Sequence, residues 1–97
     1  MCIRDSSAIN VGKLTKLNEM EELTDLVVRG LEELIDYQEY PVEAAKRSTQ
    51  SRRSLGVGYI GLAHYLAKNK VKYDSPEAWR LVHELTEHFQ YLSLIHI

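Results

Sequence analysis

The feature that most constrains the fold is an amphipathic repeat in the first half of the chain. Apolar side chains recur at steps of three and four residues, at Met20, Leu23, Val27, Leu31, Leu34 and Ile35. Because an α-helix turns once in about 3.6 residues, this spacing places them on one buried helical face. Asn18 is a candidate N-cap, with Glu21 completing a capping box, and Pro41 marks a break. We therefore predict a helix over residues 18–37, within which Gly30 indicates a close packing contact.

A second helix start lies in the last third of the sequence. Ser75 supplies a hydroxyl cap, Pro76 suits the first helical position, and Glu77 lies near the positive end of the helix dipole. The residues that follow carry an apolar stripe formed by Ala78, Val82, Leu85 and Phe89. This pattern predicts an amphipathic helix that runs toward the C-terminus.

The middle of the chain contains a short β-like segment. The run SLGVGY at residues 54–59 predicts one buried strand at about residues 53–58, which leads into a helix over residues 60–69. Residues 42–46 are expected to form a short helix at most. Residues 8–15 are expected to form an irregular segment that leads to the first helix. The predicted fold class is therefore mostly α with one short strand.

Composition and charge exclude several classes of protein. Twelve Lys and Arg against fourteen Asp and Glu give a net charge of −2 over 97 residues, so no basic field exists that would hold nucleic acid or an anionic membrane. The longest apolar stretch, residues 55–67, is shorter than the roughly 20 residues that cross a bilayer. The single cysteine, Cys2, cannot form an internal disulfide, which favours a reducing compartment. We expect a cytoplasmic protein with neither a nucleic-acid nor a membrane partner.

Three glycines in the middle of the chain match a nucleotide-binding pattern. Residues 56–61 read Gly-Val-Gly-Tyr-Ile-Gly, a GxGxxG match between a predicted strand and a predicted helix, as a dinucleotide fingerprint requires. This interpretation predicts affinity for NAD or ATP. Against it, the acid expected after the next strand is met only loosely by Asp74. The competing interpretation is that the glycines permit a tight strand-to-helix junction that packs against its neighbours.

Four cations flank a polar Ser-Thr-Gln-Ser tract. Lys46 and Arg47 precede the tract, and Arg52 and Arg53 follow it, which gives a local charge of +4. Guanidinium groups can grip a phosphate through paired hydrogen bonds. The alternative is a solvated loop whose arginines pair with neighbouring carboxylates.

Two histidines near the C-terminus are similar to a zinc-protease pattern. His83 and His88 are five residues apart, whereas HExxH places its histidines four apart. At about 100° per residue, five steps turn the two imidazoles about 140° from each other, so they cannot ligate one ion from a straight helix. We expect i,i+4 pairs instead, His83 with Glu87 and Glu84 with His88. No set of nucleophile, base and orienting residue can be combined, so we assign no catalytic, cofactor-binding or metal-binding residue.

The two ends of the chain can be translations of one short DNA element. Residues 1–5, MCIRD, can be encoded by ATG TGT ATA AGA GAC, and the reverse complement, shifted by one base, encodes the SLIHI of residues 93–97. The element resembles the transposon end used to prepare sequencing libraries. We therefore expect residues 1–6 and 92–97 to be artefacts and residues 7–91 to be the natural part, which contains no cysteine. The alternative is that the apolar tail extends the last helix.

Five strings occur in the order and spacing of one enzyme family. They are SAINVG at residues 7–12, LVVRGLEELIDYQEYP at 26–41, AAKR at 44–47, RRSLGVG at 52–58 and AHYLAK at 63–68. Over residues 8–91 the chain resembles the large, catalytic alpha subunit of class I ribonucleoside-diphosphate reductase. The succession of DYQEYP, AAKR and RRSLGVG is the distinctive part of this resemblance.

The resemblance implies the fold and the activity of a larger enzyme. It implies a ten-stranded α/β barrel, in which residues 7–91 would supply one strand with helices packed outside. It implies the reduction of ribonucleoside diphosphates to 2′-deoxyribonucleoside diphosphates, a step in DNA precursor synthesis, through a cysteine thiyl radical. It further implies a small (beta) partner subunit that holds a metal-radical cofactor, a homodimer of large subunits, nucleotide effectors and a thioredoxin-type reductant.

The catalytic residues of the family do not transfer onto this sequence. One redox cysteine of the family falls on Arg4, and Cys2 is two residues out of register. The resemblance therefore implies a fragment that lacks the catalytic residues and is inactive and only partly ordered on its own. The competing hypothesis is a small helical interaction module without catalysis.

Overall fold

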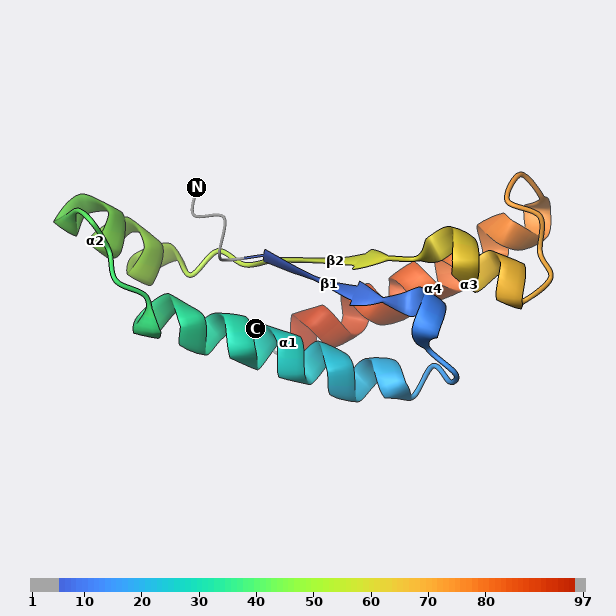
Figure 1. Cartoon of the computed structure of the whole chain (residues 1–97), viewed down its shortest axis with the longest axis horizontal. Coiled ribbons are helices and arrows are strands. Elements are labelled where there is room, and N and C mark those ends of the chain that lie inside the picture. The colour runs from blue at the N-terminus through green and yellow to red at the C-terminus, as the bar shows by residue number, and fades with distance from the viewer. Residues whose placement is uncertain (1–5, 96–97) are drawn as a thin grey trace.

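The computed structural model describes residues 6–95. These residues form the strands β1 (Ser6–Asn10) and β2 (Gly56–Ile60), the 3-10 helix η2 (Val11–Lys13), and the α-helices α1 (Glu19–Tyr37), α2 (Glu43–Arg52), α3 (Leu62–Lys68) and α4 (Pro76–Ile95). In Figure 1, α1 runs alongside the strand pair, α2 lies beyond one end of it and α3 beyond the other. The mostly helical fold class is confirmed. The terminal segments 1–5 and 96–97, which the sequence assigned to artefacts, lie outside the described residues.

The two strands form a parallel pair in a register from Ser6 opposite Gly56 to Asn10 opposite Ile60. The expectation of one strand at residues 53–58 is corrected in two respects, because β2 lies at residues 56–60 and the stretch expected to be irregular supplies β1. Strand β2 overlaps the β-like run of the sequence, whereas β1, with the sequence SSAIN, is short, rich in small residues and not specified locally. Their pairing joins segments far apart in the sequence, which local patterns do not reveal.

One face of the strand pair packs on the core. Ile9 of β1 belongs to a buried cluster with Val11, Leu14, Met20, Leu85, Phe89 and Leu92, and Val57 and Tyr59 of β2 pack against this cluster. The rings of Tyr59 and Phe89 meet edge to face, with centroids 5.8 Å apart and planes at 86°. On the other face Gly56, Gly58 and Ile60 are exposed. Within residues 6–95, helices therefore cover one side of the sheet and leave the other exposed.

Helix α1 begins as predicted but is capped by a different pair. The side chain of Asn18 makes no capping hydrogen bond. Instead, the backbone N–H of Thr15 donates to Glu19 Oε2 at 3.0 Å, and the Thr15 hydroxyl donates to Oε1 of the same carboxylate. The buried face consists of Met20, Thr24, Val28, Leu31 and Ile35. This face differs from the predicted stripe, which included Leu23, because Leu23 is 36% exposed.

Helix α2 is longer than the sequence suggested. A helix over residues 42–46 at most, followed by a polar loop, was expected, whereas α2 runs through the Ser-Thr-Gln-Ser tract to Arg52. It buries none of its residues. Arg53, the residue after the helix, adopts the left-handed conformation with φ 46° and donates its backbone N–H to Thr49 O at 2.8 Å. The contacts made by Arg53, described below, are not visible in the local sequence.

Helix α4 begins where the sequence predicts. Ser75 Oγ accepts a hydrogen bond from the N–H of Ala78 at 3.2 Å, and Pro76 is the first helical residue. The buried side chains are Ala78, Leu85, Phe89 and Leu92. The helix continues to Ile95, so residues 92–95, which the sequence assigned to an artefact, form its last turn.

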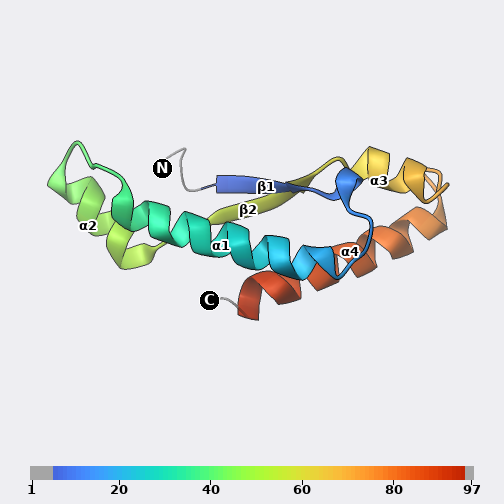
Figure 2. The ribbon, with the colours of Figure 1, turned by 60° about the horizontal axis from the view of Figure 1, so that its bottom comes forward.

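The described part of the chain is elongated. Its principal extents are 50, 22 and 18 Å, and its radius of gyration is 16.1 Å, compared with roughly 13 Å for a compact domain of about 100 residues. Figure 2 shows α1 running along the length of the molecule beside the strand pair, and α4 packs next to α1 on the same face of the strand pair. Among these residues, none of the helices has the combination of length and apolarity that a membrane crossing requires.

Candidate functional site

The glycine motif is divided between a strand and a turn. Gly56 and Gly58 lie within β2, and only Gly61 lies at the junction, where it precedes α3 with φ +79°. A dinucleotide fingerprint needs its glycines where the strand turns into the helix, so that the backbone can approach a pyrophosphate. Because Gly56 and Gly58 lie inside β2, the three glycines do not form such a loop. The nucleotide-binding interpretation is therefore not supported.

Gly61 is held in a close contact between the ends of the two strands. A Cβ at Gly61 would lie 2.6 Å from Asn10 Oδ1 and 3.1 Å from the backbone nitrogen of Gly12. A Cβ at Gly12 would in turn lie 3.0 Å from Cδ2 of His64. The packing interpretation is therefore confirmed for Gly61. It does not apply to Gly58, and the separate prediction of a close packing contact at Gly30 is wrong, because no atom of the described residues lies within 4 Å of a Cβ at either position.

These residues lie at the carboxyl ends of two parallel strands. Asn10 is the last residue of β1, and Gly61 directly follows β2. Both Asn10 and His64 are exposed. Ligand sites in α/β sheets and barrels lie at this edge. We call Asn10, Gly12, Gly61 and His64 the carboxyl edge. It is the part of the described chain whose place in the fold is suited to contact a substrate.

A small cavity lies beside the carboxyl edge, but its polar groups are largely engaged. It has a volume of about 180 Å³ and is lined in part by Leu14, Thr15, Tyr65, Lys68 and Asn69. Lys68 Nζ donates to Leu14 O at 2.7 Å, and Asn69 Nδ2 donates to Tyr65 O at 2.8 Å. Burial, together with the charge of Glu84, raises the pKa of Tyr65. The hydrogen bond from Lys68 to Leu14 therefore ties α3 to the segment after η2. The cavity offers few free polar groups to a ligand.

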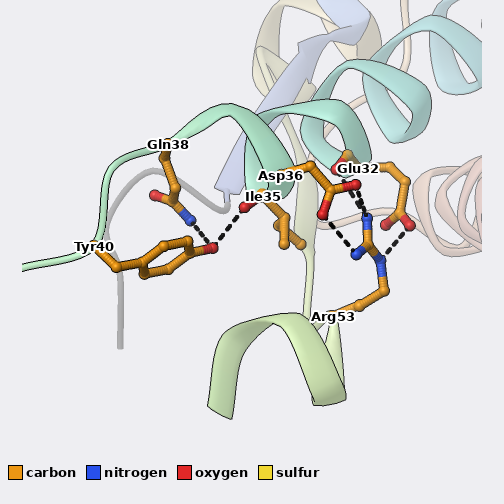
Figure 3. Close-up of polar contacts among 6 residues, drawn as sticks. All are labelled: Glu32, Ile35, Asp36, Gln38, Tyr40 and Arg53. Atoms are coloured by element: carbon orange, nitrogen blue, oxygen red, sulfur yellow. Dashed lines mark hydrogen bonds and ion pairs between the residues drawn. The ribbon is translucent and has the colours of Figure 1, made fainter. Parts of the chain in front are cut away.

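Arg53 is the cation of the basic tract that has a defined role. Its guanidinium donates through Nη1 and Nη2 to both carboxylate oxygens of Asp36, at 3.0 and 2.9 Å. It also donates through Nε to the Glu32 carboxylate, and through Nη2 to Glu32 O at 3.2 Å. Figure 3 shows this cluster joining the end of α1 to the residue after α2. Of the two alternatives for the tract, pairing with carboxylates is confirmed at Arg53.

The ion pairs change the acidity of the groups that form them. The hydrogen bond from Arg53 lowers the pKa of Asp36. The hydrogen bond to Asp36 and, to a smaller extent, the hydrogen bond to Glu32 raise the pKa of Arg53. Glu32 and Asp36 lie near the negative end of the helix dipole of α1, where carboxylates are unfavourable. A cation from outside the helix therefore stabilises its last turns.

The DYQEYP string closes the end of α1 through its second tyrosine. Tyr40 Oη donates to Ile35 O at 2.6 Å, and Gln38 Nε2 donates to Tyr40 Oη at 2.7 Å (Figure 3). The N–H of Gln38 donates to Leu34 O at 3.0 Å. These bonds satisfy carbonyls that a helix end otherwise leaves without partners. The string that carries much of the resemblance thus has a structural role.

The histidines of α4 form a surface pair. His83 Nε2 lies 3.8 Å from Glu87 Oε2, and both side chains are exposed, as expected for i,i+4 neighbours. No group of three His, Cys, Asp or Glu side chains suited to a metal ion occurs within residues 6–95.

Sequence reasoning missed the residues that meet across the fold. Glu32 and Asp36 were not identified as partners of Arg53, and Asn10, Gly12 and His64 were not connected with Gly61. One signal was available for the first group, because carboxylates without a nearby cation at a helix C-terminus predict an external partner. No local signal joins the carboxyl edge, since it depends on the pairing of β1 with β2.

Comparison with known proteins gives matches to ribonucleotide reductases. Residues 6–96 match the family model described as ribonucleotide reductase, barrel domain. The chain is 53% identical over 88 residues to the ribonucleoside-diphosphate reductase subunit alpha of Buchnera aphidicola from Acyrthosiphon pisum, and 56% identical over 88 residues to that of Haemophilus influenzae. Each match covers 91% of this chain and 12% of the relative. A vitamin B12-dependent ribonucleoside-diphosphate reductase of Mycobacterium tuberculosis is 36% identical over 73 residues, which is 75% of this chain and 10% of that protein.

Proposed function

The chain belongs to the ribonucleotide reductase barrel-domain family, and on this premise we propose that it is an internal part of the large subunit of a ribonucleoside-diphosphate reductase. The observation that carries the proposal is the match to reductase alpha subunits over 91% of the chain at 53% and 56% identity. A parallel strand pair with helices on one face supports it, since such a unit is what the wall of an α/β barrel requires.

In this proposal the whole subunit reduces ribonucleoside diphosphates to 2′-deoxyribonucleoside diphosphates for DNA precursor synthesis in the cytoplasm. The chemistry depends on a cysteine thiyl radical and on a further cysteine pair as two-electron donor. Residues 6–95 contain no cysteine. Their contribution is therefore to hold the barrel wall and to present the carboxyl edge, with Asn10 and His64, toward the barrel mouth.

The proposed partners lie outside this chain. They are a small (beta) subunit, a second large subunit, nucleotide effectors and a thioredoxin-type reductant. The described residues do not fit the metal-radical cofactor, because their carboxylates and histidines do not gather in a group of three. In this proposal the small subunit holds that cofactor, as the resemblance to the family implies. The polypeptide on its own is expected to be catalytically inactive.

An exchange experiment tests the proposal. Residues 8–91 would replace the matching segment of the Haemophilus influenzae alpha subunit, and cytidine diphosphate reduction would be measured with that organism's small subunit and a thioredoxin system. We expect the exchanged subunit to keep activity and the 97-residue chain to have none. A scrambled segment of the same composition is the control. An exchanged subunit that folds and binds the small subunit but lacks activity would contradict the proposal, and so would reductase activity of the isolated chain.

A further inference from the structure

Helix α1 carries two large apolar side chains, Leu26 and Tyr37, on a face that points away from the core. Leu26, Gly30, Glu33 and Tyr37 are spaced four, three and four residues apart, so they share one side of the helix. Leu26 is 66% exposed and Tyr37 is 88% exposed. We call these four residues the outer stripe. In Figure 2, where α1 lies in front of the strand pair, no other described element covers the near side of α1.

The outer stripe is hollowed at its centre. No atom of residues 6–95 lies within 4 Å of the position that a Cβ of Gly30 would occupy. An open depression at this point is lined by Gly30, Glu33, Leu34, Asp36 and Tyr37. Glycine inside a helix is unfavourable unless its small size is used. No described residue uses it here, so the space is available to a side chain from outside the chain.

The charge of α1 defines what can approach the outer stripe. The helix contains seven carboxylates and one cation, Arg29. Arg29 pairs with Asp25, and Arg53 pairs with Glu32 and Asp36. Glu33, at the centre of the outer stripe, makes no ion pair with another described residue. A partner that covers Leu26 and Tyr37 would thus carry apolar side chains flanked by Lys or Arg.

We infer that an amphipathic basic helix, supplied by the part of the full-length subunit outside this chain, covers the outer stripe. This inference rests on the proposed function, since the chain spans 12% of the length of the reductase subunits it matches and most of the polypeptide lies elsewhere. A second copy of this chain is a poorer occupant. Its own basic helix, α2, has the sequence EAAKRSTQSR and offers no stripe of large apolar side chains.

Two native tyrosines allow a test without substitution. Hydroxyl-radical oxidation of Tyr37 and Tyr73, which is 65% exposed in the loop before α4, would be measured by mass spectrometry with a radical dosimeter. In the 97-residue chain both should react readily. In the exchanged Haemophilus influenzae subunit, Tyr37 should react roughly tenfold more slowly than in the isolated chain, because its ring is removed from solvent. Unchanged reactivity of Tyr37 in an active exchanged subunit would overturn the inference and leave the proposed function intact.

A second measurement does not depend on the exchanged subunit. A synthetic helix with leucines at i, i+3, i+4 and i+7 and lysines beside them would be added to the isotope-labelled chain. We expect amide shifts centred on Leu26, Gly30 and Tyr37, and none with a control peptide in which serine replaces leucine. A Gly30→Trp variant, which fills the depression, should abolish the shifts. Absence of shifts at millimolar peptide overturns the inference, as does concentration-dependent protection of Tyr37 without peptide, which would identify a second copy as the occupant.

Discussion

The guanidinium of Arg53 binds both carboxylate oxygens of Asp36, at 3.0 and 2.9 Å, across a gap of seventeen residues in the sequence. The contact joins the last turn of α1 to the residue that follows α2 and leads toward β2. Arg53 adopts a left-handed backbone conformation, which costs a non-glycine residue free energy. The paired hydrogen bonds and the contact with Glu32 O offset that cost.

The first prediction concerns substitutions of Arg53. Arg53→Lys keeps the charge but loses the planar fork, so we expect it to lower the thermal midpoint of helix unfolding less than Arg53→Ala does. Arg53→Gly should lie between the wild type and Arg53→Ala, because glycine adopts the left-handed conformation without strain. Far-UV circular dichroism would measure the midpoints. The matched control is Arg52→Ala, one residue earlier, and an equal loss in that variant would show that the paired contact contributes nothing specific.

The pKa of Asp36 predicts how this contact depends on pH. Arg53 lowers the pKa of Asp36 below its ordinary value of 3.8. A carboxylate with a depressed pKa in the folded state stabilises the fold fully above its unfolded pKa, and this contribution is lost as pH falls through the folded value. The difference in thermal midpoint between wild type and Asp36→Asn should therefore be constant near neutral pH and should shrink below about pH 4. Glu33→Gln, on the same helix, is the control. A difference that grows on acidification would contradict this assignment.

The sequence predicted those elements whose determinants are local. Helix α4 was placed because Ser75, Pro76 and Glu77 are adjacent, and the structure confirms the cap. Strand β1 was missed because SSAIN has little β character of its own and depends on its register with β2. The predicted helix at residues 42–46 is shorter than α2 because the Ser and Thr residues that follow favour turns. The end of α2 is fixed by Arg53, whose partners lie on α1. The candidate site was least predictable, since Asn10, Gly12, Gly61 and His64 meet only after the strands pair.

The N-cap of α4 gives a prediction with a defined magnitude. Ser75→Ala removes the acceptor for the N–H of Ala78, and we expect a loss of about 1 kcal/mol in the free energy of helix unfolding. Ser75→Asp should retain most of the stability, because a carboxylate also caps a helix and interacts favourably with the dipole. Urea titration followed by circular dichroism would measure both. Ser93→Ala, near the other end of α4, is the control, and a loss there as large as at Ser75 would argue against a capping effect.

The glycines of the carboxyl edge and the outer stripe should respond in opposite directions. Gly61→Ala places a Cβ 2.6 Å from Asn10 Oδ1 in a backbone with φ +79°, so we expect it to destabilise the chain by about 1–3 kcal/mol. Gly30→Ala meets open space in α1 and should stabilise the isolated chain by up to about 1 kcal/mol, because alanine has the higher helix propensity. Urea midpoints of the two variants and of Gly58→Ala, which also meets open space, would be compared. If Gly61→Ala proved as benign as Gly58→Ala, the close contact between the ends of β1 and β2 would not be a constraint on the fold.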